Sequence, residues 1–550
     1  MEATPNRKRF QDLGIGAGLG ALSSLAVIAI LYLGERFFGL PFVPFDIFDW
    51  MTRVLPGGLI AFVIRTMVAV IEFGQSLFPI GDTSTVAKLA EQSIALVQLV
   101  GGGAAFGLAL AWLNRTRNDS LAMYGQLGGL TLLAVTLFIE NSLATVQVDA
   151  NAVLWLTVIF VGWGWGLSRL VRESVPQEAD SEEQALSRRQ FLKVSGAGVS
   201  ALALGAWGLT RLFGEDAPQA VASSARTPSG DDPFGAALTS GPASSPSPED
   251  LAARPAPVSG TRPELTPTED YYRIDINTRP AEIDGESWRL KVSGLVDRPG
   301  ELSIDELRAY PSQTQILTMQ CISNSIGGDL TSSTRWTGLR FKDLMEALGM
   351  DLTAAGAFIK SVDGFYEFVV MDDIMDDRTL LVYDMNGAPL PVKHGFPLRV
   401  YIPNRYGMKQ PKWIESIEIA SERIDGYWVD RGWSREAFAH TVSVVDTVVV
   451  DPEQGENGTA KAGGIAWAGA RGISKVEVRV NSEPWQAAEL IAPPLSSLNW
   501  VLWRYSWPYE AGRHSIRVRA YDGEGVLQIE ESQGARPNGA TGVHSIRVTI

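Results

Sequence analysis

Two contrasting patterns of hydrophobic and polar residues divide this chain. Before about residue 213 the apolar residues form long uncharged runs, whereas after about residue 269 they alternate with polar residues over short stretches. In a helix, roughly 20 apolar residues at 1.5 Å rise per residue cross the hydrocarbon core of a bilayer. Runs of about that length predict four membrane-spanning helices, at Leu13–Gly34, Ile94–Leu113, Leu121–Ile139 and Asn151–Ser168.

A fifth apolar stretch, Val54–Ile71, is less regular, because it includes Pro56-Gly57-Gly58 and Arg65. It is compatible with a span, a re-entrant segment or an interfacial helix. Positive residues at 7–9, 115–117 and 169–172 mark cytoplasmic flanks. An even number of crossings between flanks favours two crossings within 13–113, with the fifth stretch on or dipping into the outer side. Residues 1–186 are thus predicted to form a multi-pass transmembrane bundle.

The stretch Ser187-Arg-Arg-Gln-Phe-Leu-Lys193 precedes a further uncharged run at 194–210. It resembles a twin-arginine export signal, with an ordinary positive flank before a last helix as the alternative. No small-residue cleavage site follows, so residues 187–213 are expected to remain as an anchor helix. The twin-arginine export machinery would then be a partner. The predicted location is the inner cell membrane, with the downstream domains on its extracytoplasmic side.

The second half of the chain begins with a change in composition. Residues 214–268 are rich in Pro, Ser and Ala, and lack hydrophobic periodicity, which predicts a disordered tether. Residues 269–438 mix short helical and strand patterns, as in an α+β domain. Residues 439–550 contain strand patterns alone and predict an immunoglobulin-like sandwich. The predicted fold class is multidomain: an α-helical transmembrane bundle, an α+β domain and an all-β immunoglobulin-like sandwich.

The alternation also places individual elements in the second half. In the α+β domain, short helices are expected at Ser303–Ala309 and Phe341–Leu348, and strands at Trp288–Gly294, Gln315–Gln320, Ala357–Val362, Leu380–Asp384, Leu398–Ile402 and Trp413–Ala420. In the sandwich, strands are expected at Val442–Val450, Gly464–Trp467, Lys475–Val480, Trp500–Trp507, His514–Ala520 and His544–Ile550.

Composition refines this picture through charge. The chain carries a net charge of −15, of which −1 falls in residues 1–213 and −14 in the remainder. This balance argues against nucleic acid as a partner, because phosphate binding relies on clustered Lys and Arg. The mean hydropathy of +0.04 is therefore an average over an apolar helical part and an acidic soluble part.

Cysteine and histidine usage restricts the metal chemistry. The chain has one cysteine, Cys321, and no histidine before His394. A single thiol excludes an internal disulfide, a cysteine zinc site, an iron–sulfur cluster and covalently attached haem, and the helices lack the histidines of a bis-histidine haem. Cys321 follows an expected strand, where a thiolate could bind a soft metal or act as a nucleophile. The alternative is a buried cysteine with a purely structural role. For the nucleophile, His394 is the only histidine of this domain that could activate it.

A series of motifs follows in a characteristic order. They are Cys321-Ile-Ser-Asn324, Trp336-Thr-Gly338-Leu339, Ser361-Val-Asp363-Gly364, Tyr383–Pro391, His394–Pro403, Tyr406-Gly407 and Lys412-Trp413. In this order and spacing, residues 265–549 resemble the sulfite oxidase family of molybdopterin-dependent oxidoreductases, whose last domain is an immunoglobulin-like dimerisation domain. The resemblance implies a molybdenum–molybdopterin cofactor, oxygen-atom transfer to or from a small-molecule substrate, and a homodimer as one assembly.

The resemblance also assigns residues. Cys321 becomes the thiolate ligand of molybdenum, in keeping with the preference of soft metals for thiolates. The pterin and its phosphate are expected to contact Tyr272, Arg273, Asp363, His394, Arg399, Gln410, Pro411 and Lys412. Among these, Arg399 and Lys412 supply charge that can neutralise a phosphate. Tyr427 matches a tyrosine above the family's active site, so the expected catalytic residues are Cys321 and Tyr427.

Two positions depart from the pattern of sulfite-oxidising members. Ile274 and Ile326 stand where those members carry arginines, and losing two cations weakens the binding of an oxyanion. The arginines that could compensate are Arg273, Arg335, Arg405 and Arg431. Because neither haem nor an iron–sulfur cluster is expected in this chain, electrons would pass to or from an external cytochrome or a quinone.

The competing interpretation is a metal-free cell-surface protein that keeps the fold and uses its last domain for adhesion. The cysteine and the phosphate-contact pattern disfavour that interpretation. A transport role for the helices has little support, since the predicted spans contain few ionisable residues.

Overall fold

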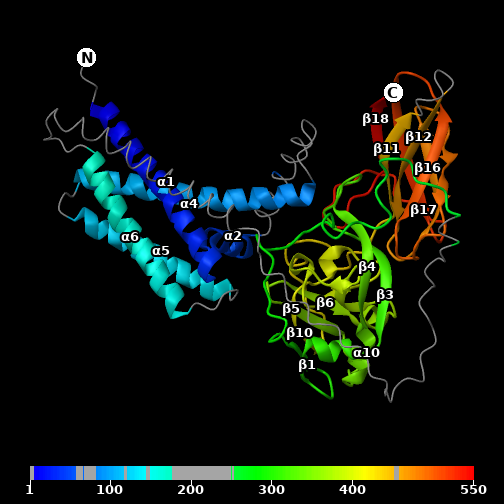
Figure 1. The fold of residues 1–550 in the computed structure, drawn as a ribbon, viewed down its shortest axis with the longest axis horizontal. Coiled ribbons are helices and arrows are strands. Elements are labelled where there is room, and N and C mark those ends of the chain that lie inside the picture. Colours follow the sequence, from blue (N-terminus) through cyan, green and yellow to red (C-terminus); the bar gives the residue numbers. More distant parts are fainter. Residues whose placement is uncertain are drawn as a thin grey trace. The chain divides into compact units, whose positions relative to one another are not determined.

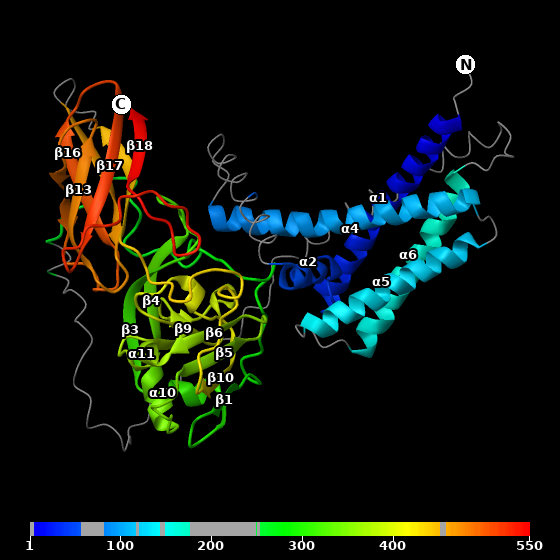
Figure 2. The same cartoon turned by 180° about the vertical axis from the view of Figure 1, so that it is seen from behind.

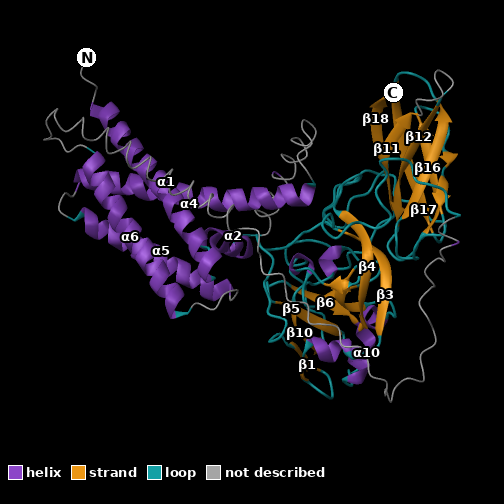
Figure 3. Ribbon diagram, in the orientation of Figure 1, coloured by secondary structure: helices purple, strands orange, loops and turns teal. Residues whose placement is uncertain are grey.

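The computed structural model describes residues 5–56, 66, 82–116, 120–143, 149–175, 249, 253–450 and 458–550 (Figure 1). The twin-arginine motif, the anchor run after it, most of Val54–Ile71 and most of the predicted tether lie outside the described residues. The chain divides into two compact units, a helical one from the first part and a β-rich one from the second, and Figure 3 shows this contrast in secondary structure.

The described helices of the first unit are α1 (Pro5–Phe38), α2 (Val43–Val54), α4 (Thr83–Thr116), α5 (Leu121–Leu143) and α6 (Ala150–Ser174). Four segments of them are long and apolar enough to cross a membrane: Phe10–Phe38, Thr83–Arg115, Leu121–Leu143 and Ala150–Ser174. Each contains one of the four runs named above, so the prediction of four long apolar helices is confirmed.

Glycines allow these helices to pack with their backbones close together. A side chain on Gly20 of α1 would collide with the carbonyl oxygen of Gly103 in α4, and one on Gly164 of α6 would collide with that of Gly125 in α5. Small residues serve this purpose in membranes, where the hydrophobic effect does not drive helices together. The two helix pairs are therefore held by close van der Waals packing.

Replacing Gly164 with valine should loosen the contact between α5 and α6. The new side chain has no room, and overpacking of this kind costs at least about 1–3 kcal/mol. The thermal midpoint of the full chain in detergent, followed by circular dichroism, should fall. Gly162→Val is the matched control on the same helix, because a side chain there meets nothing within 4 Å. Equal losses in the two variants would contradict the packing argument.

Two sheets build the first part of the β-rich unit. The first has the order β2-β1-β10-β5-β6, with β1 parallel to β10; its strands are β1 (Leu290–Gly294), β2 (Gly300–Leu302), β5 (Gly356–Ser361), β6 (Tyr366–Val370) and β10 (Ile414–Ala420). The second has the order β3-β4-β7-β8, with β9 paired to β7; its strands are β3 (Ser312–Gln320), β4 (Thr331–Arg340), β7 (Leu380–Met385), β8 (Ala388–Pro389) and β9 (Arg399–Tyr401).

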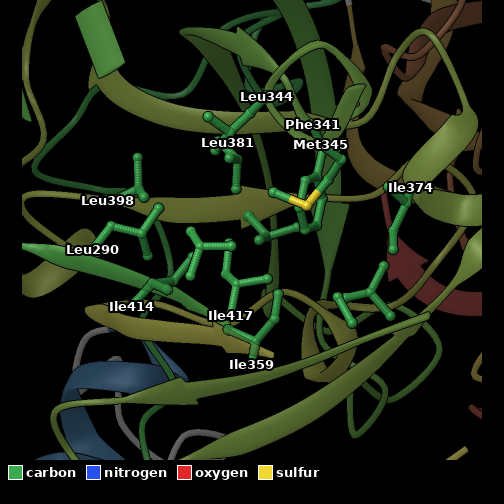
Figure 4. Close-up of a cluster of buried hydrophobic side chains, with 14 of the residues drawn as sticks. Leu290, Phe341, Leu344, Met345, Ile359, Ile374, Leu381, Leu398, Ile414 and Ile417 are labelled. Carbon is green, nitrogen blue, oxygen red and sulfur yellow. The ribbon is translucent and has the colours of Figure 1, made fainter. Parts of the chain in front are cut away.

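Short helices connect these strands and help to fill the space between the sheets. They are α9 (Ile304–Arg308), α10 (Phe341–Ala347), α11 (Met371–Met375), η1 (Val392–His394) and η2 (Gly407–Lys409). The largest core of this part combines Leu290, Ile359, Ile414 and Ile417 of the first sheet with Leu381, Leu398, Phe341, Leu344, Met345 and Ile374 (Figure 4). Burial of this apolar surface, at about 25 cal/mol per Å², stabilises the packing of the sheets on one another.

The last part of the chain is a sandwich of two four-stranded sheets (Figure 2). One sheet contains β11 (Val442–Val450), β12 (Thr459–Trp467), β16 (Val501–Pro508) and β15 (Glu489–Ile491), and the other β14 (Gln486–Ala487), β13 (Ile473–Val480), β17 (Arg513–Asp522) and β18 (His544–Thr549). Their inner faces share one apolar core. A second apolar cluster joins the sandwich to residues near Cys321, including Ile322 and Tyr406. Every strand and helix predicted for the second half overlaps an observed element.

Residues 254–273 run along both parts of this unit, and we call this segment the strap. Arg262 pairs with Asp446 of β11 at 2.9 Å, and the carbonyl of Glu264 accepts a hydrogen bond from Trp500 Nε1 at 3.1 Å. Further along, the Thr266 amide donates to the carbonyl of Ser333 in β4 at 2.6 Å. The last residues of the stretch that composition predicts to be a disordered tether thus make specific contacts with both parts of the unit.

Candidate functional site

Cys321 begins the loop that joins β3 to β4. Its amide donates to the carbonyl of Leu330 at 2.9 Å, and the side-chain oxygen of Asn324 accepts from the Leu330 amide at 3.0 Å. Asn324 therefore closes the loop, which gives a physical reason for its spacing from the cysteine. The thiol lies 3.0 Å from Ser323 Oγ and is 8% exposed. Burial raises the pKa of the Cys321 thiol, so without a metal the group stays neutral.

Arg399, on β9, lies buried beside the end of β3. Its Nη1 donates to the carbonyl of His394 at 3.1 Å, and its Nη2 is 3.4 Å from the sulfur of Met319. The guanidinium also stacks on Trp336, 4.8 Å from the ring centre. Burial lowers the pKa of Arg399, so its charge is held in a poorly solvated place.

Lys412 and Arg273 converge on one carboxylate. Lys412 pairs with Asp275 and also donates to the carbonyl of Ile274 at 3.2 Å. Asp275, whose side chain is inaccessible to solvent, pairs with Arg273 as well. Burial lowers the pKa of Lys412 to about 8, against the opposing effect of Asp275. Sequence reasoning did not single out Asp275, because it lies in a segment without strand or helix pattern and its partner Lys412 lies far along the chain.

His394 lies in η1 and is almost fully buried. Its Nε2 is 3.4 Å from the carbonyl of Thr268, and its ring meets the ring of Tyr271 edge-on at 5.3 Å. Burial, followed by the charges of Lys412 and Arg399, lowers the pKa of His394 to about 3. The imidazole is therefore neutral at physiological pH and adds no further charge to the site.

This group of side chains, which we call the cation pocket, has an excess of positive charge. Within the described part of the chain it brings three cations, Arg273, Arg399 and Lys412, to one carboxylate, Asp275. Several of its buried polar atoms have no protein partner among the described residues: Arg399 Nε, Arg273 Nη2, Tyr271 Oη, Trp336 Nε1 and Gln410 Oε1. Buried cations are unfavourable unless they are paired. The pocket therefore fits an anionic group with several acceptor oxygens, such as a phosphate.

The remaining predicted contacts are held beside this pocket by ring stacking and hydrogen bonds. Tyr272 stacks on Tyr271 with ring centres 5.6 Å apart. The Gln410 side chain donates to the carbonyl of Arg405 at 3.0 Å, and the carbonyl of Pro411 accepts from the Val400 amide at 2.9 Å. These bonds fix the segment before Lys412 against β9. The structure thus gathers Tyr272, Arg273, His394, Arg399, Gln410, Pro411 and Lys412 in one region.

Asp363 and Tyr427 have other immediate neighbours. Asp363, in the turn between β5 and β6, accepts from the Phe365 amide at 3.0 Å. Tyr427 is buried among the rings of Phe365, Tyr366 and Trp428. The guanidinium of Arg431 lies 3.5 Å from the centre of the Tyr427 ring. Of the neighbours named, Phe365 lies in the turn before β6, Tyr366 lies in β6, and Trp428 and Arg431 lie in the loop after β10.

The arginines that could replace the missing cations are largely engaged elsewhere. Arg405 pairs with Asp373 at 3.0 Å and donates to the carbonyl of Glu436 at 2.7 Å. Arg431 stacks on Tyr427 and donates to its carbonyl at 2.9 Å. Ile326 packs against the apolar cluster around Ile322. The charge of Arg405 is thus already neutralised inside the protein.

The pKa of Lys412 predicts a pH dependence of the cofactor-free protein. Because the folded pKa of about 8 lies below the usual lysine value of 10.5, the unfolded chain binds more protons between these pH values, and stability rises with pH. From pH 8 to 10 the free energy of unfolding should increase by about 2 kcal/mol relative to Lys412→Met. Urea denaturation of both proteins in detergent, after expression in a host without pterin synthesis, measures this slope. Parallel pH profiles would contradict the burial of this ammonium group.

Comparison with known proteins finds a matching family model and several similar proteins. The family model for the oxidoreductase molybdopterin binding domain matches residues 277–428. The uncharacterized oxidoreductase YuiH of Bacillus subtilis is 32% identical over 171 residues, which cover 31% of this chain and 84% of that protein. Human mitochondrial sulfite oxidase is 27% identical over 316 residues, covering 48% of this chain and 57% of that protein.

YedZ1 of Azospira oryzae, named as a candidate subunit of a protein-methionine-sulfoxide reductase, is 30% identical over 189 residues, covering 34% of this chain and 64% of that protein. The chain thus spans roughly three fifths of the length of YedZ1 and of the human enzyme. Among solved structures, the sulfane dehydrogenase SoxCD of Paracoccus pantotrophus matches with a TM-score of 0.45 and 17% identity, over 55% of this chain and 83% of that one.

Proposed function

This chain belongs to the sulfite oxidase family of molybdopterin oxidoreductases, and on that premise we propose that its cation pocket holds the phosphate end of a molybdenum–molybdopterin cofactor whose metal Cys321 ligates. The observation that carries this proposal is the excess of buried and half-buried cations over carboxylates around Asp275. A metal-free binding protein would have no use for unneutralised buried charge, which is unfavourable without a bound anion.

We assign roles to the chain's own residues on the basis of their contacts. Arg399, Lys412 and Arg273 bind the phosphate, and neutral His394 adds a hydrogen bond without repelling or attracting charge. Cys321 would hold the metal as a thiolate, since a coordinating thiol is deprotonated, although burial raises the pKa of the free group. The bound cofactor supplies the oxygen-atom transfer and the two-electron chemistry. Asp363 and Tyr427 complete the proposed site from the side of β6.

For the substrate, we propose a neutral S-oxide that is reduced, rather than sulfite that is oxidised. Ile274 and Ile326 replace the cations expected for an oxyanion, and Arg405 is paired with Asp373. A substrate site that lacks these two cations discriminates against a dianion, since the desolvated oxyanion would have fewer partners. The name of YedZ1, with its reference to protein methionine sulfoxide, supports the same choice.

The proposed setting is the inner cell membrane. The four apolar helices anchor the chain, and twin-arginine export through residues 187–193 places residues 269–438, the molybdopterin domain, and 439–550, the immunoglobulin-like domain, on the extracytoplasmic side. An external cytochrome or a quinone exchanges electrons with the cofactor, and the last domain supports a homodimer.

The decisive experiment combines elemental analysis with two assays on the full chain. Protein from a host that makes the cofactor should contain stoichiometric molybdenum. It should oxidise reduced viologen with a methyl sulfoxide as acceptor faster than it reduces ferricyanide with sulfite. Absence of molybdenum would contradict the proposed cofactor, whereas a molybdenum-loaded enzyme that prefers sulfite would contradict only the proposed substrate.

A further inference from the structure

The outer face of the sheet β14-β13-β17-β18 is strongly basic in an acidic chain. Val476, Val478, Ile516 and Val518 point into the sandwich core, so the residues that alternate with them face outward. Six cations lie on this outer face: Lys475, Arg479, Arg513, Arg517, Arg519 and Arg547. We call this the basic face. Its charge contrasts with that of the chain as a whole, which has a net charge of −15.

Three guanidinium groups of the basic face converge on one indole ring. The Cζ atoms of Arg479 and Arg519 lie 4.5 and 4.4 Å from the centre of the Trp485 ring, and that of Arg517 lies 6.0 Å from it. Arg479 and Arg517 are directly opposite one another in the register of β13 and β17. Like charges in such a pair repel, which destabilises the sheet unless an anion lies between them.

The protein neutralises only one of these three arginines. Arg519 pairs with Glu477 at 2.8 Å and with Glu530 at 3.2 Å. Across the described residues, neither Arg479 nor Arg517 has a carboxylate within ion-pair distance. Two preorganised guanidinium groups that share an aromatic platform are well suited to bind phosphate oxygens through paired N–H groups.

We propose that the basic face binds the phosphate headgroups of anionic phospholipids in the membrane that anchors this chain. The four apolar helices are long and apolar enough to anchor the chain in a lipid bilayer. Trp485 suits this partner, because indole rings favour the headgroup level of a bilayer. Basic residues near an anionic leaflet attract it within a Debye length. This inference rests on the proposed membrane anchoring and is independent of the cofactor and substrate.

The test uses the full chain in nanodiscs of phosphatidylcholine, which leave the basic face free to capture added vesicles. Vesicles with phosphatidylglycerol should co-sediment the nanodiscs, whereas pure phosphatidylcholine vesicles should not. Arg479→Gln combined with Arg517→Gln should reduce capture roughly 30-fold, since two cations near an anionic surface are lost. The matched control, Arg289→Gln with Arg298→Gln, removes two exposed arginines outside this sheet and should keep capture.

Each other outcome has a defined meaning. Capture that is the same for both kinds of vesicle, or that survives in the Arg479/Arg517 variant, overturns the inference. A variant that changes the oligomeric state while capture stays constant overturns it in favour of a second copy of the chain. Failure of the full chain to enter nanodiscs contradicts the proposed anchoring instead. Melting curves of both variants verify that these surface substitutions leave the fold intact.

Discussion

Cys321→Ser should lower turnover with the preferred substrate by more than about a hundredfold. Even substitutions of residues that only support a metal ligand reduce metal affinity or activity about 10–100-fold. Serine is close in size to cysteine, and the position is buried beside Ser323, so the fold should persist. The hard hydroxyl lacks the affinity of a thiolate for a soft metal. Besides kcat, the absorption band from thiolate-to-metal charge transfer should disappear. Pterin content, measured by fluorescence after oxidation, should remain, because the cation pocket is intact.

Ser323→Ala is the control for this experiment. It removes the hydroxyl that lies 3.0 Å from the thiol and leaves the sulfur in place. Its turnover should stay within a few-fold of wild type, with an unchanged charge-transfer band. A Cys321→Ser protein that keeps both the band and the turnover would remove the thiol from the site and leave it as a buried structural residue.

Arg399→Met should separate stability from cofactor binding. In the proposed site this cation holds a phosphate, so the variant should retain the cofactor 10–100-fold less well on dialysis. Without the cofactor, however, the arginine is a buried charge whose Nε lacks a partner among the described residues. Its replacement by an apolar side chain of similar length should therefore leave the cofactor-free protein as stable as wild type or stabilise it, by up to about 1–4 kcal/mol. Denaturation of both forms measures the two effects independently.

Arg405→Met gives the contrasting result. This arginine is also buried, but Asp373 and Glu436 neutralise it. Its removal leaves the half-buried carboxylate of Asp373 unpaired, which costs up to about 3–5 kcal/mol in both the cofactor-free and the loaded protein. If Arg399→Met destabilised the cofactor-free protein as much as Arg405→Met does, the interpretation of the cation pocket as an anion site would fail.

The strands that alternate apolar and polar residues could be predicted from sequence, whereas β4 could not. Its first residues, Thr331-Ser-Ser-Thr334, carry hydroxyl groups and yet are buried. Two of these hydroxyls are satisfied by distant parts of the chain: Ser333 donates to the carbonyl of Leu317 at 3.2 Å, and Thr334 donates to Asn386 at 2.7 Å. A hydroxyl that is satisfied inside a sheet looks like a surface residue in a hydrophobicity pattern. Only the neighbouring strands reveal the difference.

The site shows the same limit. Cys321 could be placed because a strand pattern ends before it. Arg399 and Lys412 could be placed because they interrupt apolar runs. The carboxylate that organises them, Asp275, comes from a segment without strand or helix pattern, and its role depends on Lys412, which lies far along the sequence. Long-range pairing of this kind is set by tertiary structure, which a single sequence does not display.

The strap has a practical consequence for dividing this chain into parts. Composition suggests that the catalytic unit begins near residue 269, yet Arg262, Glu264 and Thr266 hold the sandwich and β4 together from outside that boundary. A fragment cut at 269 would lose all three contacts and expose the indole N–H of Trp500 and the edge of β4 to solvent. A fragment that begins before Arg254 retains them, so the shortest useful soluble version of this enzyme starts inside the proline-rich stretch.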